Sequence, residues 1–270
     1  MATADAAAEP TRRAWTGRRL SDGATIYWWA EVLMCALFYL VYSAGRNANE
    51  GRPSVAFRNA KGLIHLEHVL GIFQEATLER WALHFKPLII ACNYYYGSLH
   101  FIVTIGVAIV LFRKWSDDYP RWRNTLGIST GLALIGFISY PLMPPRLLST
   151  FAPHTHYGFV DTLAKYPTPW SFDSGAVSKI SNQFAAMPSV HCAWALWCAC
   201  VLVPHLKHPI ARAAAVLYPI LTVIVIVRTA NHYFLDAVGG FATLGIGYVI
   251  AHLITKAGTG RERRFAWVRA

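Results

Sequence analysis

Charged side chains are scarce in this sequence. They make up 14% of its 270 residues, whereas about a quarter of the residues in an ordinary soluble domain are charged. Hydrophobic residues reach 55%, and the mean hydropathy is +0.34. Because so few charges cannot cover the surface of a soluble domain of this length, the composition argues against that class and predicts a polytopic membrane protein.

Several other features are absent. The sequence contains no internal repeat of solenoid period and no low-complexity tract, which argues against repeat and linker proteins. Acidic residues are few, 14 against 25 lysines and arginines, yet the net charge of +11 forms no basic stripe or nucleic-acid-binding motif. We therefore expect no nucleic acid partner. The cysteines lie within or beside apolar runs, where they favour core packing over a disulfide framework or a zinc site: Cys35, Cys92, Cys192, Cys198 and Cys200.

The apolar residues gather into six runs of roughly 20 residues, the length that crosses a bilayer as a helix. They predict an all-α, polytopic membrane helical bundle with both termini on one side. A cytosolic tail at 1–24 and a basic cytosolic tail at 256–270 would flank a membrane domain at 25–255. The predicted spans are 25–44, 88–112, 124–143, 189–204, 210–228 and 233–254.

The basic residues orient this bundle. With the N-terminus inside, most lysines and arginines fall in short segments on the inner side, which the positive-inside rule assigns to the cytoplasm. These segments meet anionic lipid headgroups, and we expect an integral membrane protein of the plasma membrane. The inner set is Arg12, Arg13, Arg18, Arg19, Arg113, Lys114, Arg121, Arg123, Lys207, Arg212, Lys256, Arg261, Arg263, Arg264 and Arg269.

Two regions outside the predicted spans stand out. Residues 61–83 mix glutamates and basic residues with leucines and aromatics, a pattern typical of an amphipathic helix on the outer membrane surface. Residues 144–187 are rich in proline and form a loop longer than most connections in compact proteins. Loops of that length are usually functional, so this loop is a candidate lid over a site.

Ionisable residues cluster where the fourth and sixth predicted spans begin and the fifth ends. The stretch MPSVH ends at His191, and the stretch RTANHYFLD runs from Arg228 through His232 to Asp236. In the orientation above all of them face the non-cytoplasmic side. His232 and Asp236 are four residues apart, hence on one helical face, where a carboxylate can fix the ring tautomer and stabilise a charged imidazole. Attack on phosphorus needs such a nucleophile, a cation for the phosphate oxygens and an acid for the leaving group, roles that suit His232, Arg228 and His191.

Two helix starts add hydrogen-bond donors to this set. Pro188 fits a position near the first helical residue, so the backbone amides around Ser189 and Val190 would point outward and bind an anion. Asn231 can cap the sixth helix in the same way.

The paired motifs MPSVH and RTANHYFLD resemble the second and third signature motifs of the type 2 phosphatidic acid phosphatase superfamily, across roughly residues 60–255. AAMPSVH with NHYFLDAVGG is more narrowly similar to the branch that contains inositol phosphorylceramide synthases. The resemblance implies a six-helix membrane fold and a metal-free reaction through a phosphohistidine on His232. It also implies general acid or base work by His191, orientation by Asp236 and phosphate contact by Arg228.

The sequence departs from this family pattern in two places. Val190 stands where the second motif usually has glycine. The first motif is nearly matched from Lys114 to Arg121, but Trp122 replaces its proline and the stretch falls on the predicted cytoplasmic side. We therefore expect Arg146, at the end of the third span, to be the second phosphate-binding cation, with Asn231 as a further phosphate contact.

Two enzymatic outcomes share this machinery. Water attacking the phosphohistidine gives a lipid phosphate phosphatase, and an alcohol gives a phosphotransferase. The alternative is a non-enzymatic lipid-binding or transport protein that retains the fold, although the complete set of ionisable residues argues against it. We expect membrane lipids and a phosphorylated lipid substrate as partners, no cofactor and no metal.

Overall fold

The computed structural model describes residues 17–47, 53–153, 157–168 and 183–266, and they are almost entirely helical. The only strands within these ranges, β1 and β2, form a short antiparallel pair. The elements, in chain order, are β1 (Arg18–Arg19), β2 (Thr25–Ile26), α2 (Trp28–Asn47), α3 (Pro53–Val69), α4 (Glu75–Leu83), α5 (Lys86–Tyr94), the π-helix η1 (Tyr95–Leu99), α6 (His100–Lys114), α7 (Tyr119–Ser139), α8 (Pro145–Phe151), α9 (Thr162–Lys165), α10 (Val190–His205), α11 (Pro209–Arg228) and α12 (Phe234–Ala266).

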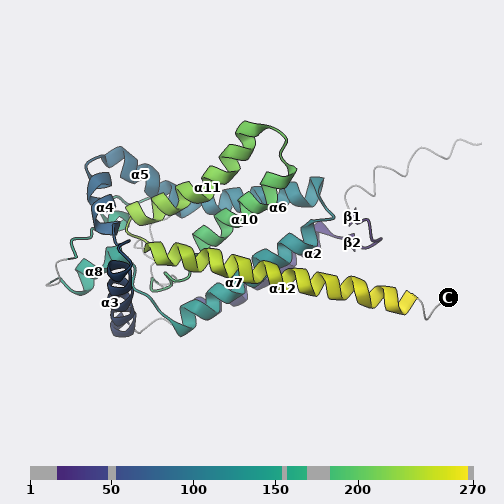
Figure 1. Ribbon diagram of the computed structural model, residues 1–270, viewed down its shortest axis with the longest axis horizontal. Helices are drawn as coiled ribbons and strands as arrows, with labels where there is room; N and C mark the ends of the chain where they lie inside the picture. The colour runs from purple at the N-terminus through teal and green to yellow at the C-terminus, as the bar shows by residue number, and fades with distance from the viewer. Residues whose placement is uncertain (1–16, 48–52, 154–156, 169–182, 267–270) are drawn as a thin grey trace, which may run out of the picture.

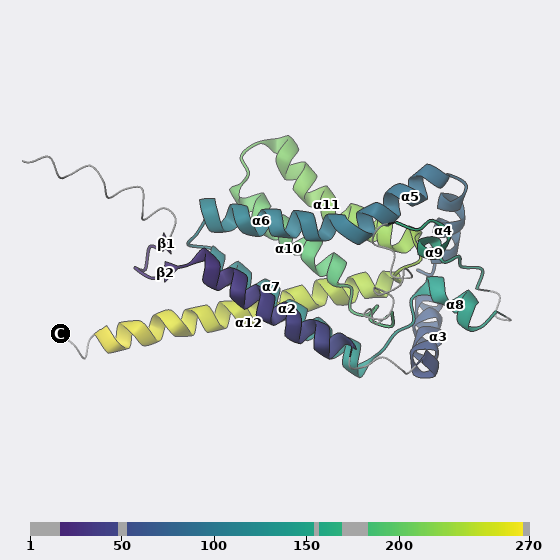
Figure 2. The same cartoon turned by 180° about the vertical axis from the view of Figure 1, so that it is seen from behind.

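The long helices form an elongated bundle, and the short elements mark its two opposite ends. The β1–β2 pair and the end of α12 lie at one end, and α3, α4 and α8 lie at the other (Figures 1 and 2). Ser21 N donates to Asp117 Oδ1 at 2.7 Å, which places the α6–α7 connection beside the strands. His205, at the end of α10, pairs with Asp118 at 3.1 Å at that same end. The α11–α12 connection lies at the other end, because Phe234 N donates to Glu75 of α4.

All six predicted spans fall on helical segments. Within the described ranges, four segments are long and apolar enough to cross a membrane: Trp28–Gly45, Lys86–Lys114, Pro209–Arg228 and Phe234–Lys256. The shorter apolar helix Val190–His205 and α7 correspond to the other two. Large apolar side chains such as Ile102, Val238 and Leu253 are exposed on these helices, as expected for surfaces that face lipid. The all-α membrane bundle is confirmed.

The region predicted as one amphipathic helix at 61–83 differs from the prediction. It forms two helices, α3 and α4, which are separated at Leu70–Gln74. Glu67, Glu75 and Glu79 are fully buried, whereas Val69 and Trp81 are exposed. The three glutamates therefore point into the protein, where backbone amides need acceptors, whereas Lys61 and Arg80 of the same helices are exposed.

Glycines bring the 187–189 segment close to two long helices. A Cβ at Gly136 of α7 would overlap Cδ of Pro188, and a Cβ at Gly240 of α12 would overlap the carbonyl oxygen of Ser189. The segment that precedes α10 is thus held between α7 and α12. This close packing of small residues, common in membrane bundles, positions His191 at the start of α10.

Candidate active site

A tight turn joins α11 to α12 and carries the second predicted histidine. The backbone amides of Asn231 and His232 both donate to the carbonyl of Ile226, at 3.0 and 3.2 Å. Ala230 has a φ of 52°, in the left-handed region that a non-glycine residue rarely adopts. Its carbonyl accepts from the amide of Arg146 at 2.8 Å, so α8 helps to hold the turn in this conformation.

His232 is paired with Asp236 as the spacing predicted. Nδ1 of the ring lies 3.2 Å from Oδ2 of Asp236, and the two side chains are 4% and 0% exposed. The amide of Tyr233 donates to the same carboxylate oxygen at 3.0 Å. A carboxylate at Nδ1 favours the tautomer with the proton there, which leaves an unprotonated lone pair on Nε2. Nε2 is buried and has no hydrogen-bond partner among the residues described.

The charge state of His232 follows from its surroundings. Burial lowers the pKa of His232 to about 4. The Ala186 carbonyl acts in the opposite direction, and the positive charge of Arg146 adds a smaller lowering effect. The ring is therefore neutral near pH 7. A neutral imidazole with a free Nε2 is the form that can attack an electrophile.

His191 lies beside this nucleophile candidate. The ring centroids of His191 and His232 are 5.5 Å apart, with an interplanar angle of 63°. On its other sides, His191 stacks on Tyr96 at 4.4 Å and contacts the ring of His100 at 4.2 Å. Tyr96 belongs to the π-helix η1, a local widening that is frequent at functional sites. The structure thus brings the two predicted histidines together.

The start of α10 differs from the expectation for an outward-facing anion site. Pro188 precedes the helix, and Ser189 is its N-cap, with a side chain that accepts from Cys192 N. The amide of Ser189 does not point outward, because it donates to the backbone carbonyl of Asp236 at 2.9 Å. This bond joins the His191 segment to the His232 segment. Ser189 is fully buried, and its hydroxyl hydrogen is its remaining donor.

Asn231 does not cap α12, contrary to expectation. Its Nδ2 donates to Oγ1 of Thr229 at 2.8 Å within the turn. The first amides of α12 instead find carboxylates from α3 and α4: Phe234 N donates to Glu75 Oε1 at 3.0 Å, and Leu235 N donates to Glu67 Oε1 at 2.8 Å. A helix start inside the protein must find acceptors, and here they come from distant helices.

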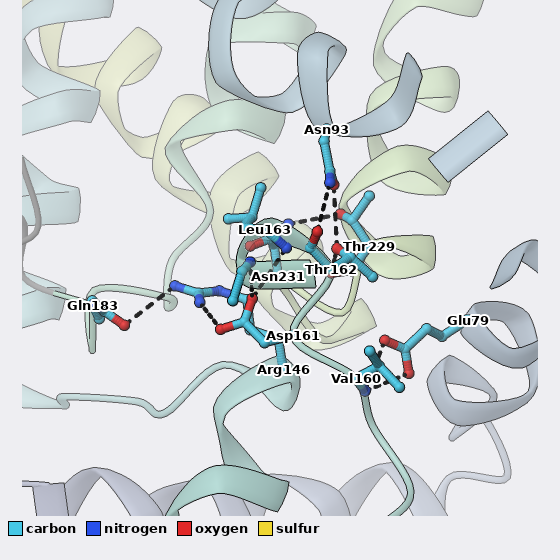
Figure 3. Close-up of polar contacts among 11 residues, drawn as sticks. Glu79, Asn93, Arg146, Val160, Asp161, Thr162, Leu163, Gln183, Thr229 and Asn231 are labelled. Carbon is cyan, nitrogen blue, oxygen red and sulfur yellow. Dashed lines mark hydrogen bonds and ion pairs between the residues drawn. The ribbon is translucent and has the colours of Figure 1, made fainter. Parts of the chain in front are cut away.

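Arg146 lies next to the turn and is ion-paired. Its Nη1 contacts Oδ2 of Asp161 at 2.6 Å, and Nη2 donates to Gln183 at 3.4 Å (Figure 3). Asp161 also caps α9, and Thr162 beside it contacts both Asn93 of α5 and the carbonyl of Thr229. The described part of the predicted 144–187 loop therefore closes over the α11–α12 turn, and it presents a carboxylate to the arginine.

Arg228 occupies a different position from the other predicted residues. Its guanidinium lies over the ring of Trp81 at 4.6 Å, and its Nε is buried without a hydrogen-bond partner among the described residues. No hydrogen bond or ion pair in the described ranges joins Arg228 to either histidine. Arg228 is therefore a cation with an unsatisfied donor at the end of α11.

The near-match to the first family motif lies far from this site. Arg121 pairs with Asp118 at 2.9 Å, and the α6–α7 connection contacts the strand end of the bundle. A phosphate held between the two histidines is thus out of its reach. The loop histidines His154 and His156 lie outside the described residues.

Sequence reasoning missed several residues of the site. Asp161 and Gln183 at Arg146 had no recognisable signal, because their contacts depend on how the long loop folds back. Glu67 and Glu75 had a signal, acids among leucines and aromatics next to membrane spans, but this pattern also predicts an amphipathic helix on the membrane surface. Acids at such a depth require partners, and that requirement would have directed attention to a helix start.

Comparison with known proteins gives the family of this chain. No curated protein and no solved structure matches the chain. A family model, that of the PAP2 superfamily, matches residues 61–250. The match contains both histidines, their aspartate and both arginines, so this chain belongs to the PAP2 superfamily, a superfamily of phosphatases.

Proposed function

We propose that this protein is an integral membrane phosphatase or phosphotransferase that acts on a lipid phosphate or phosphodiester through a phosphohistidine on His232. One observation carries the proposal. His232 presents a buried, unpaired Nε2, its Nδ1 is held by Asp236, and a second histidine lies beside its ring. This is the arrangement of a nucleophilic imidazole that is oriented by a carboxylate and has an acid beside it.

In the first step the Nε2 lone pair of His232 attacks phosphorus, and the bond from phosphorus to the leaving lipid oxygen breaks. His191, which takes up a proton when the anionic phosphate binds beside its ring, gives that proton to the departing oxygen. As the N–P bond forms, the His232 ring gains positive charge, which the Asp236 carboxylate stabilises. The products are a phosphohistidine and an alcohol.

In the second step His191, now neutral, takes a proton from water or from an acceptor alcohol, whose oxygen attacks the phosphohistidine. The N–P bond breaks, and its electrons return to Nε2 of His232. Water yields a phosphatase, and a lipid or inositol hydroxyl yields a transferase. The similarity of AAMPSVH and NHYFLDAVGG to the inositol phosphorylceramide synthase branch favours transfer.

Four residues are proposed to bind the phosphate oxygens. Arg146 is buried near His232 and exchanges its bond with Asp161 for the substrate. Arg228 offers an unpaired Nε, Asn231 has a second amide hydrogen beyond the one given to Thr229, and Ser189 has its hydroxyl hydrogen. Together they supply the charge and donors that a transferring phosphoryl group requires.

The site is proposed to face the non-cytoplasmic side of the plasma membrane, with both termini in the cytoplasm. The support is geometric. The α11–α12 connection, which carries His232, lies beside α4, at the end of the bundle opposite to the end of α12 (Figure 1). Basic residues gather in the connections at the end where α12 ends.

The test is a set of reactions with detergent-purified protein. A phosphatidic acid, an isoprenoid phosphate and a phosphatidylinositol donor are each supplied with and without an acceptor lipid. Release of inorganic phosphate identifies hydrolysis, and a new phospholipid identifies transfer. His232→Ala should insert into membranes and be inactive, whereas His205→Ala, which alters a histidine at the opposite end, should stay active.

Labelling provides the second arm. Phosphorus-labelled substrate should leave label on the wild-type protein that is lost in acid and stable in alkali, as expected for a phosphohistidine. Full activity of His232→Ala would exclude the mechanism. Lipid binding by the wild type without turnover of any of these substrates would favour the non-enzymatic alternative.

A further inference from the structure

Three consecutive backbone amides at the start of α12 donate to buried carboxylates from three different residues. The distances are 3.0, 3.0 and 2.8 Å. The donor and acceptor pairs are Tyr233 with Asp236, Phe234 with Glu75, and Leu235 with Glu67. Two of these acceptors are more than 150 residues away in the sequence, so α3 and α4 fix where α12 begins.

Glu67 and Glu75 are fully buried and adjacent to each other. In each glutamate Oε1 accepts from α12, and the other carboxylate oxygen, Oε2, has no partner within the described residues. Burial, together with the neighbouring carboxyl group of Glu75, raises the pKa of Glu67 to about 9. A proton between the two carboxyls satisfies both free oxygens and leaves one negative charge at the helix start, where the helix dipole favours it.

We propose that Glu67 and Glu75 form a proton-sharing acid pair that positions the nucleophile, by anchoring the first turn of α12 so that Asp236 meets His232. This role rests on the proposed function. Neither glutamate is a catalytic residue, since neither contacts His232 in the described structure. They act through the backbone amides of residues 234 and 235, which lie between His232 and Asp236 in the sequence.

The pair explains why the acids of α3 and α4 face inward. Two ionised carboxylates beside the Asp236 carboxylate would repel one another in this buried site, and two neutral acids would lose the attraction of the helix start. One shared proton avoids both costs. A displacement of the α12 start would move Asp236 relative to Nδ1 of His232, and activity depends on geometry at that scale.

The kinetic test compares an isosteric with a truncating substitution. In Glu67→Gln an N–H of the side-chain amide donates to Glu75 in place of the shared proton, and the amide oxygen still accepts from Leu235 N. We expect its kcat to stay within about threefold of the wild type. In Glu67→Ala the amide of Leu235 and the carboxylate of Glu75 both lose a partner. We expect kcat to fall about 10- to 100-fold with little change in KM.

Glu31→Ala is the matched control. It removes a glutamate that pairs with Arg123 at 2.6 Å on α2, at the strand end of the bundle, and it should lower thermal stability without changing kcat. If Glu67→Ala keeps the wild-type kcat, or if Glu67→Gln loses as much kcat as Glu67→Ala, the positioning role is refuted.

A spectroscopic test is independent of activity and of the folding of Glu67→Ala. The protein with Glu67 intact and the Glu67→Gln variant are compared in a Glu79→Gln background, which removes the other fully buried glutamate of α4. Infrared spectra should contain the carbonyl stretch of a protonated carboxylic acid, shifted in heavy water and lost in Glu67→Gln. Identical spectra would refute the shared proton. If the protein with Glu67 intact has this band but turns over no lipid phosphate, the acid pair is supported and the proposed function is excluded.

Discussion

Replacing Asp236 by asparagine tests the centre of the proposed site. The substitution keeps the size of the side chain and an oxygen for the amide of Tyr233, but it removes the charge next to Nδ1 of His232. Nδ1 of His232 and the amide of Tyr233 both contact Oδ2, so the asparagine oxygen takes that place and accepts from both. The positive charge that develops on the ring then has no counter-charge. We therefore expect a large loss of kcat in a folded protein.

The magnitude follows from the contact distance. At 3.2 Å, a full charge pair is worth about 5 kcal/mol with an effective dielectric constant of about 20. The ring carries between half and all of a positive charge when phosphorus is transferred. The loss of this stabilisation lowers kcat by about 10²- to 10⁴-fold.

The assay measures initial rates of phosphate release or lipid product formation, together with phosphoenzyme formation in a single turnover. Asp118→Asn is the matched control, because Asp118 pairs with His205 at 3.1 Å at the opposite end of the bundle. It should change kcat little. A kcat of Asp236→Asn within about threefold of the wild type would refute the orienting role of Asp236.

Three further predictions concern pH, the arginine and inhibitors. Because the pKa of His232 is lowered to about 4, kcat/KM should persist below pH 6.5 and be lost only as the pH falls through about 4. The ionisation of the substrate is titrated separately. A loss of kcat/KM already near pH 6.5 would contradict the neutral buried ring. Asp161→Asn keeps the α9 cap but frees Arg146, so inhibition by inorganic phosphate should strengthen by about three- to tenfold; unchanged inhibition would argue against Arg146 as a phosphate ligand. Vanadate should inhibit and a chelator should not, since the nucleophile and the acid are both assigned to side chains; strong inhibition by the chelator would require a different mechanism.

Local contacts of the site could be predicted from the sequence. The spacing of His232 and Asp236 places both on one face of a helix start, and their contact at 3.2 Å is found. The apolar runs predict the spans, and the chain direction then brings His191 and His232 to one end. Their ring contact at 5.5 Å follows from that topology.

Contacts that depend on packing could not be predicted in this way. The amide of Ser189, expected to point outward, is occupied, because α12 packs close enough for the Asp236 carbonyl to accept from it. The bond between Arg146 and Asp161 depends on the path of a long loop, and the position of Arg228 over Trp81 depends on α4. A sequence pattern reports which residues share an element, and it contains little information on contacts between distant elements.

The distant caps of α12 have a chemical rationale in the turn itself. A helix start is usually capped by a short polar side chain just before it, but here the preceding residues have other tasks. Asn231 bonds within the turn, His232 is the proposed nucleophile, and the hydroxyl of Tyr233 donates to the carbonyl of Met143 at 3.1 Å. Moving the acceptors to Glu67 and Glu75 leaves the turn free for chemistry. The same bonds make the position of His232 dependent on α3 and α4, so changes in these two helices should affect turnover before they affect insertion.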